Sequence, residues 1–306
     1  MKRRATLLSA FLLLTWSGYA QPSGRDSHNY GASSVDEDPG GGTWSESGYI
    51  GPEVKSPREV DTHSTGTPTW TNPTRFEKDT FTFVRVRRGH TASGPPGNWA
   101  TDTPDSDLNL SYRLQQLTAI RVNPDGRFIR LTDPDLGDYP FIYMVEPGSL
   151  YLNEEEIAAL GRYLNNGGFL MLDDFWGESE WRNAERVLKK VLPDRSFTEL
   201  PLDHPVYHCV FEIKTKGQVP NIRLGQQSEL DPAHRTWELN HDGDVRTVHH
   251  RAIFDDKGRI MVIATHNTDN GDGWEREGES DYYFNTFSAK ISYPLGINII
   301  FYAMTH

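Results

Sequence analysis

Two short, continuous apolar runs constrain the fold of this 306-residue chain more than any other feature. Residues 141–145 have the sequence FIYMV, and residues 169–172 have the sequence FLML. Neither run shows the polar alternation of a strand that has one face in solvent. Continuous apolar strands are typical of parallel sheets that are buried on both faces. The sequence therefore predicts a parallel sheet between two layers of helices.

Helical patterns alternate with these runs. Asn153 and Glu156 have the spacing of a capping box, and Gly167-Gly168 is expected to end the helix that they begin. Apolar side chains also recur at helical spacing in residues 106–117, 179–191 and 294–304. The chain thus alternates between strand patterns and helix patterns.

Further strands are predicted at residues 81–86, 128–131, 210–213, 252–254 and 259–264. The last two are separated by the turn sequence DDKG at residues 255–258, so they are expected to form a hairpin. We therefore predict one α/β domain with a doubly wound, mainly parallel sheet that is flanked by helices and carries a late antiparallel hairpin.

The first 20 residues are typical of an export signal. Lys2-Arg3-Arg4 precedes an apolar stretch, and Gly18-Tyr19-Ala20 places small residues before a cleavage site. The apolar stretch is too short to span a bilayer comfortably. We predict a secreted or periplasmic protein with no transmembrane segment after cleavage of residues 1–20. An uncleaved N-terminal anchor is the alternative.

Residues 21–74 are rich in Gly, Ser, Pro, Thr and acids, and they lack apolar periodicity. Such a composition buries too little apolar surface to offset the entropy lost on ordering. We predict a flexible, low-complexity leader over residues 21–74 and a single α/β domain over residues 75–306.

Charge and cysteine content exclude several classes of partner and site. The formal net charge is −12, and removal of Lys2, Arg3 and Arg4 with the signal takes it to −15. Proteins that bind nucleic acid present clustered Lys and Arg, so no nucleic-acid partner is expected. Cys209 is the single cysteine, which excludes an intramolecular disulfide and a cysteine-based zinc site.

Acidic residues follow two of the predicted strands. Asp173 and Asp174 end the strand at residues 169–172, and Asn267, Asp269 and Asp272 follow the strand at residues 259–264. If these strands are neighbours, their carboxylates converge where open α/β sheets bind ligands. Oxygen-rich clusters suit Ca²⁺ or Mg²⁺, so a divalent cation on Asp173, Asp174, Asp269 and Asp272 is a possible cofactor. Alternatively, these acids cap helices and hold loops.

Two tryptophans accompany the acids. Trp176 and Trp274 lie close to them in the sequence, and rings beside carboxylates match the faces and hydroxyls of sugars. The leading hypothesis is binding of a polar small molecule or glycan, such as a carbohydrate or a cell-envelope component. The alternatives are a carboxylate- or metal-dependent hydrolase in the same cleft and an interaction module of an envelope assembly.

Basic residues follow the first predicted strand, namely Arg85, Arg87, Arg88 and His90. Arg85 is a candidate for binding an anionic ligand, and an internal salt bridge with an acid is the alternative. His204 and His208 have a spacing that suits zinc on a helix. Pro205 lies between them and no Glu accompanies them, so the zinc signal is weak.

Four motifs in the same order resemble the bacterial family called domain of unknown function 4159, over about residues 81–302. The motifs are Trp99-x-x-Asp102-x-Pro104-x-x-Asp107-x-Asn109, Asn166-Gly167-Gly168-Phe169-Leu170-Met171-Leu172-Asp173-Asp174-Phe175-Trp176, His204-Pro205-x-x-His208 and His266-Asn267-x-Asp269-x-Gly271-Asp272-x-Trp274-Glu275. Asp102 of the first motif joins the candidate ligand-binding residues.

That family resembles the class I glutamine amidotransferase-like, flavodoxin-like folds, including the trehalose-utilisation type. The resemblance implies a fold and no activity. The strand–turn–helix elbow that carries the amidotransferase cysteine is missing, and Cys209 lies at the start of an apolar run, as a structural thiol would. Hydrolase, phosphate-binding and dinucleotide motifs are also missing. We assign no catalytic residue, and the sequence favours a domain that is not an enzyme.

Overall fold

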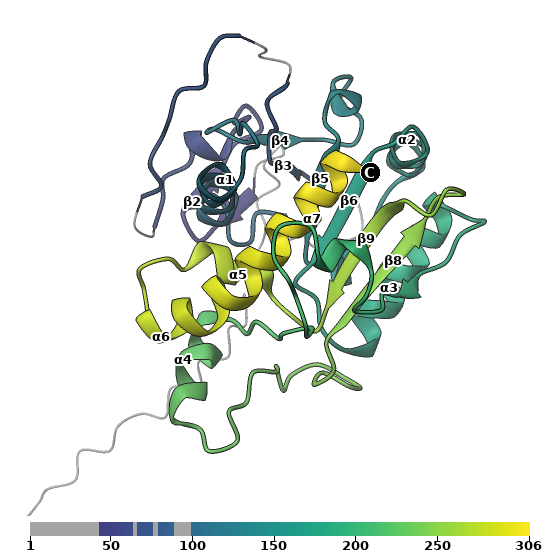
Figure 1. Cartoon of the computed structure of the whole chain (residues 1–306). Helices are drawn as coiled ribbons and strands as arrows, with labels where there is room; N and C mark the ends of the chain where they lie inside the picture. The colour runs from purple at the N-terminus through teal and green to yellow at the C-terminus, as the bar shows by residue number, and fades with distance from the viewer. Residues whose placement is uncertain (1–42, 64–65, 76–78, 89–98) are drawn as a thin grey trace, which may run out of the picture. The chain divides into compact units, whose positions relative to one another are not determined.

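The computed structural model describes residues 43–63, 66–75, 79–88 and 99–306. The signal, the first part of the leader and His90 lie outside these residues. Seven strands of the described chain form one sheet in the order β4-β3-β5-β6-β9-β8-β7 (Figure 1). They are β3 (Val84–Val86), β4 (Arg127–Ile129), β5 (Phe141–Val145), β6 (Phe169–Asp173), β7 (Thr198–Glu199), β8 (His249–Phe254) and β9 (Ile260–His266).

Five neighbouring strands, β4, β3, β5, β6 and β9, are parallel to one another. β8 pairs antiparallel with β9, and β7 pairs antiparallel with β8. Helices cover both faces of the sheet. They are α1 (Asp105–Leu117) and α7 (Tyr293–Thr305) on one face, and α2 (Glu154–Asn165) and α3 (Gly177–Val191) on the other. The predicted α/β architecture with a late antiparallel hairpin is confirmed.

The side chains of β5 explain why the sheet needs both layers. Phe141, Tyr143 and Val145 pack in the core beneath α1 and α7. Ile142 and Met144 pack in the core beneath α2 and α3. Successive side chains of a strand point to opposite faces, so a strand without polar residues requires an apolar layer on each side.

Local signals in the sequence account for several boundaries. The capping box at the start of α2 is present, with Asn153 accepting from the amide of Glu156 and Glu156 accepting from the amide of Asn153. The turn at residues 255–258 joins β8 to β9 as predicted. Residues 210–213 do not form the predicted strand. The side-chain oxygen of Asn298 instead accepts from the amides of Val210 and Phe211. These amides are therefore hydrogen-bonded without a neighbouring strand.

Two helices lie in segments for which no helix was predicted: α4 (Ile222–Leu230) and α5 (Asn270–Glu275). The final helical region also begins earlier than predicted, with α6 (Asp281–Tyr283) and the π-helix η6 (Phe284–Ser292) preceding α7. Short 3₁₀ helices complete the structure. They are η1 (Pro57–Glu59), η3 (Leu136–Asp138), η4 (Pro147–Ser149) and η5 (Pro205–Tyr207).

Residues 43–63 and 66–75, which we call the pre-sheet segment, pack against the α/β domain. The segment begins with the hairpin of β1 (Thr43–Ser45) and β2 (Gly48–Ile50). Ile50 is fully buried against Trp99 and Phe128, and the guanidinium of Arg87 donates to the carbonyl of Ile50 at 3.1 Å. The packed chain therefore starts well before residue 75, because polar backbone contacts hold a segment that has few apolar residues.

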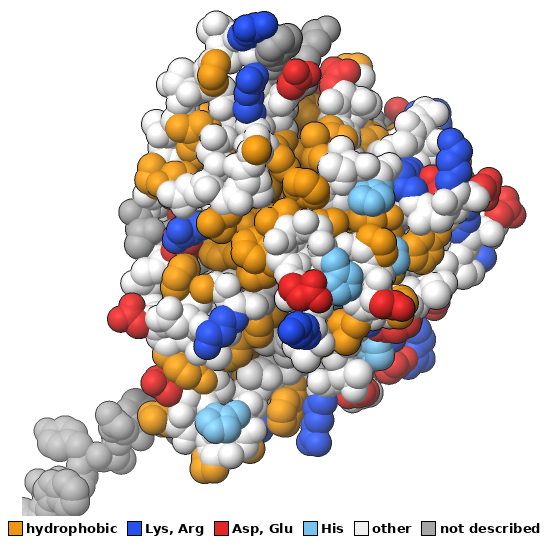
Figure 2. All heavy atoms as spheres, viewed as in Figure 1, with side chains coloured by type: hydrophobic (Ala, Val, Ile, Leu, Met, Phe, Trp, Pro, Cys, Tyr) orange, Lys and Arg blue, Asp and Glu red, His pale blue; other side chains and the backbone are white. Residues whose placement is uncertain are grey.

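Figure 2 shows the face of the molecule that carries α7. Apolar side chains occupy much of the middle of this face, and charged side chains lie mainly around them. Among the described residues, no helix combines the length and the apolar character that crossing a membrane requires.

His250 makes the fold sensitive to acid. Its ring is buried and contacts the hydroxyl of Tyr207 at 2.9 Å, and burial lowers the pKa of His250 to about 3. Because this pKa is below the unfolded value of about 6.5, the stabilisation is present above pH 6.5 and is lost as pH falls towards 3. Between pH 7 and pH 5, urea unfolding should show that the unchanged protein loses about 2 kcal/mol more than His250→Gln.

The exposed His208 provides the matched control. Its ring pairs with Glu212 at the surface. The hydrogen bond with Glu212 raises the pKa of His208, which adds stability as pH falls, so His208→Gln should show at least the full loss of stability between the two pH values. Equal pH dependence in His250→Gln and the unchanged protein would contradict the assignment of His250.

Candidate functional site

The carboxyl ends of three strands bring acidic residues together. β6 and β9 are parallel neighbours, with Leu172 opposite Ala264, so the chain leaves both strands at the same edge of the sheet. Asp174 follows β6, Asp269 follows β9, and Asp102 lies between β3 and α1. One carboxylate oxygen from each of these three residues lies within 4.8 Å of the others. We call Asp102, Asp174 and Asp269 the acidic group.

The topology of the sheet also favours a site here. The chain passes from β3 to α1 on one face and from β5 to α2 on the other. The connections therefore diverge between β3 and β5, which is where open α/β sheets form a ligand-binding crevice. Asp102 lies on the first of the diverging connections.

The backbone at two members of the acidic group is unusual. Asp102 has φ of 63° and Asp174 has φ of 57°. Asn267, at the end of β9, has φ of 61°. Residues other than Gly rarely adopt positive φ, although Asp and Asn tolerate it best. Conformations of this kind cluster at ligand-binding and catalytic sites.

Among the described residues, the acidic group is not paired with a basic side chain. Asp102 is 6% exposed and Asp269 is 5% exposed, and Oδ2 of Asp102 has no hydrogen-bond partner. Within the described ranges, no ion pair joins the acidic group to a Lys, Arg or His. Burial raises the pKa of Asp102, Asp174 and Asp269 well above the usual range, and the neighbouring acids raise each pKa further.

The start of α5 fits closely against the acidic group. Asp269 caps this helix by accepting from the amide of Asp272 at 2.8 Å. A Cβ on Gly271 would lie only 2.0 Å from Oδ2 of Asp102, so glycine is the residue that allows this approach. The adjacent residue Asn270 has a buried side-chain oxygen without a hydrogen-bond partner.

Asp173 has a different role from the one predicted. Its carboxylate accepts from the hydroxyl of Tyr143 at 3.2 Å, the side-chain amide of Asn270 at 2.8 Å and the backbone amide of Gly271 at 3.0 Å. Thr265 on β9 also donates to it. A carboxylate with four donors has little capacity left for a cation. Asp173 therefore fixes α5 to the sheet, and it is Asp174 that meets the other acids.

Two further predicted residues are also occupied by protein groups. The side chain of Asn267 accepts from the amide of Gly177 at 2.9 Å and donates to two backbone carbonyls. Asp272 accepts from the amide of Ile222 at 2.6 Å and pairs with Arg276 at 3.2 Å. Both side chains hold loops around the acidic group.

Neither predicted tryptophan offers a ring to a ligand. Trp176 is 2% exposed and Trp274 is fully buried. The ring of Trp274 packs against Tyr143, with centroids 5.8 Å apart, in the core beneath α7. Trp176 donates from its indole nitrogen to Asp174 at 3.3 Å. The expectation that these rings stack on a sugar is therefore wrong.

Arg85 pairs internally. Its guanidinium contacts Asp107 at 2.8 Å, and both side chains are completely buried. It also donates to Ser106 and to the carbonyls of Trp99 and Thr101. These contacts occupy the guanidinium, so the internal salt bridge, rather than an anionic ligand, accounts for Arg85. Its partner Asp107 lies outside the acidic group.

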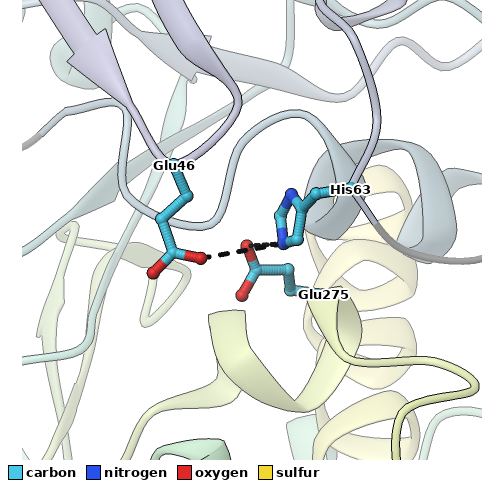
Figure 3. A group of neighbouring side chains, drawn as sticks. All are labelled: Glu46, His63 and Glu275. Carbon is cyan, nitrogen blue, oxygen red and sulfur yellow. Dashed lines mark ion pairs between the residues drawn. The ribbon is translucent and has the colours of Figure 1, made fainter.

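A charged network that was not predicted from the sequence lies beside the acidic group. Glu275 at the end of α5 and His63 of the pre-sheet segment are 2.9 Å apart, and Glu46 approaches the same histidine ring at 3.8 Å (Figure 3). Glu275 also lies within 4.8 Å of Asp102 and Asp272. His63 and Glu46 were missed because their segment has the composition of a flexible leader.

A comparison with family models identifies the domain. The model described as domain of unknown function (DUF4159) matches residues 82–304. The chain belongs to this family. The DUF4159 region thus contains the whole acidic group, whereas His63 and Glu46 precede it. Among curated proteins, no sequence matches the chain significantly.

His204, His208 and Cys209 do not belong to the acidic group. His204 accepts from the amide of Val206, and His208 pairs with Glu212 on the surface. Neither joins the groups of potential metal ligands found among the described residues. Cys209 is half-buried, and burial raises the pKa of its thiol, which disfavours a nucleophilic thiolate.

Proposed function

We propose that the acidic group binds a hard divalent cation, Ca²⁺ or Mg²⁺, and that the protein uses this cation to hold a polar ligand. The observation that carries the proposal is the approach of three carboxylates, two buried and one half-buried, within 4.8 Å, with no ion pair to a basic residue among the described residues. Several negative charges confined in this way repel one another. Carboxylate oxygens at this separation are the ligands that hard divalent cations prefer.

A cation explains the geometry better than direct acid–base chemistry on a sugar. The two carboxyl groups of a retaining glycosidase lie about 5–5.5 Å apart, and those of an inverting enzyme lie farther apart. The acidic group instead brings together three carboxylates, with one oxygen of each within 4.8 Å of the others, whereas a glycosidase uses two. The buried rings of Trp176 and Trp274 also remove the stacking surface that a glycosidase or lectin would use.

The cation would link the protein to its ligand. Ca²⁺ takes six to eight oxygen ligands, so three carboxylates leave positions for ligand hydroxyls or carboxylates. The export signal that we predict at residues 1–20 would place the site outside the cytoplasm. A polar component of the cell envelope, including a carbohydrate, is then the expected class of ligand. Extracellular Ca²⁺ modules bind with dissociation constants of about 10⁻⁴–10⁻³ M.

We also propose that the domain shares its ancestry with the glutamine amidotransferase-like folds but not their chemistry. The mainly parallel sheet with helices on both faces is compatible with such a fold. Cys209 follows η5 rather than a strand of the sheet, and its thiol contacts the carbonyl of Pro205. A cysteine so placed supports the view that the amidotransferase nucleophile is missing.

A calorimetric titration tests cation binding. Ca²⁺, Mg²⁺, Mn²⁺ and Zn²⁺ are added in turn to full-length protein that has been treated with chelator. We expect Ca²⁺ or Mg²⁺ to bind at one site. Asp102→Asn, Asp174→Asn and Asp269→Asn should each weaken binding by roughly tenfold or more, since each removes an anionic ligand. Asn tolerates positive φ and caps helices well, so these variants keep the local backbone.

Asp138→Asn is the matched control, because Asp138 is exposed in η3 and does not belong to the acidic group. It should bind the cation as the unchanged protein does. If none of the four cations binds at concentrations up to about 10 mM, well above the dissociation constants of weak extracellular sites, the proposal is wrong.

A further inference from the structure

The pre-sheet segment places a positive charge in the field of the acidic group. Nδ1 of His63 lies 3.0 Å from Asp105, and Nε2 lies 2.9 Å from Glu275. Both ring nitrogens thus face carboxylates, and Nη1 of Arg276 also approaches Nε2 at 3.3 Å. Only an imidazolium can donate to both carboxylates. Figure 3 shows His63 between the chain of the segment and the end of α5. The hydrogen bond to Asp105, above all, raises the pKa of His63 to about 10.

The carboxylates around His63 are continuous with the acidic group. Asp105 lies three residues after Asp102 at the start of α1. Glu275 lies within 4.8 Å of Asp102, which belongs to the acidic group itself. The imidazolium therefore adds a positive charge close to the acidic group, and this charge stabilises the carboxylates electrostatically.

A second basic residue completes the docking of the segment. The guanidinium of Arg276 contacts Glu46 of the β1–β2 turn at 2.8 Å and Glu275 at 2.5 Å. Because Arg276 occupies the space between Glu46 and Glu275, this network is held by protein charges and has no need of its own metal ion. The pre-sheet segment contributes both His63 and Glu46 to this network, and His63 is its positively charged member.

We propose that the pre-sheet segment regulates the acidic group: the His63 imidazolium and the divalent cation compete for the same negative field, so docking of the segment weakens cation binding. This inference rests on the proposed function. Coupling between two sites is reciprocal, so cation binding must weaken docking of the segment by the same factor. A ligand or partner that displaces the segment would thereby increase the affinity for the cation.

Calcium titrations of the full-length protein and of two variants test the competition. Removal of the charge in His63→Gln should lower the dissociation constant for Ca²⁺ by roughly fivefold, as expected for one nearby unit charge that is partly screened. His63→Lys keeps the charge and should bind Ca²⁺ about as the unchanged protein does. His208→Gln is the matched control, because the pair of His208 and Glu212 shares no residue with the network.

The outcomes separate the inference from the function on which it rests. If the unchanged protein binds Ca²⁺ and His63→Gln binds it equally or more weakly, the inference is wrong while the proposed function stands. If none of the proteins binds a divalent cation, the proposed function fails and the inference fails with it. Hydrogen exchange gives an independent reading: amides of residues 43–63 should exchange faster with Ca²⁺ than without it, and slower exchange would overturn the inference.

Discussion

Asp102→Asn is expected to stabilise the cation-free protein while it weakens cation binding. The substitution removes one of the mutually repelling charges of the acidic group, and Oδ2 of Asp102 has no hydrogen bond to lose. We expect a gain of about 0.5–2 kcal/mol in the free energy of unfolding at pH 8, the usual size for such a change at a functional site. Urea unfolding in chelator measures it.

The pH dependence of this gain provides the check. The pKa of Asp102 is raised in the folded state, so the folded protein binds more protons than the unfolded chain. The charged carboxyl group therefore destabilises the fold increasingly as pH rises above its unfolded pKa of about 3.9. The difference between Asp102→Asn and the unchanged protein should be larger at pH 8 than at pH 5. A variant that is less stable than the unchanged protein at pH 8 would contradict the repulsion.

Arg85→Met should be the most destabilising of the substitutions considered. It leaves Asp107 as a buried charge without its partner, and it also leaves the carbonyls of Trp99 and Thr101 without a donor. Breaking a buried ion pair on one side typically destabilises a protein by about 3–5 kcal/mol. Urea unfolding at pH 7 measures the loss.

Two variants calibrate this result. Arg182→Met breaks the exposed pair with Glu178 and should change stability by less than about 1 kcal/mol. Arg85→Met combined with Asp107→Leu removes both charges and should recover part of the lost stability, because no buried charge then remains unpaired. A loss below about 1 kcal/mol in Arg85→Met alone would show that the pair is dispensable.

Strand and helix patterns were sufficient to predict the architecture and the edge of the sheet where the acids meet. The apolar runs at residues 141–145 and 169–172 form the central strands β5 and β6, as predicted, and β9 pairs beside β6. The pattern did not distinguish Asp173 from Asp174. Side chains of consecutive residues point in different directions, so only one of the two can face the other acids. The groups that donate to Asp173 come from α5, and the sequence of α5 has no apolar periodicity from which a helix could be predicted.

The pre-sheet segment shows why composition alone does not predict whether a segment is ordered. Its residues resemble a flexible linker because they have few apolar side chains and many Gly, Ser and Pro. The structure holds them through the guanidinium of Arg87, which donates to the carbonyl of Gly51, through Arg58, which donates to the carbonyl of Pro124, and through the ion pairs of His63. Contacts of this kind depend on residues distant in the sequence, so no local pattern reports them.

The hydrogen bond from the amide of Phe128 to the carbonyl of Lys55, at 2.7 Å, has a consequence for how the domain is delimited. β4 is an edge strand of the sheet, and residues near Lys55 cover it. Without them, backbone groups of β4 would be exposed and unpaired. A recombinant fragment of residues 82–304 would lack these covering residues, and its exposed edge strand is expected to promote self-association. The region that defines the family is thus shorter than the packed part of the described chain.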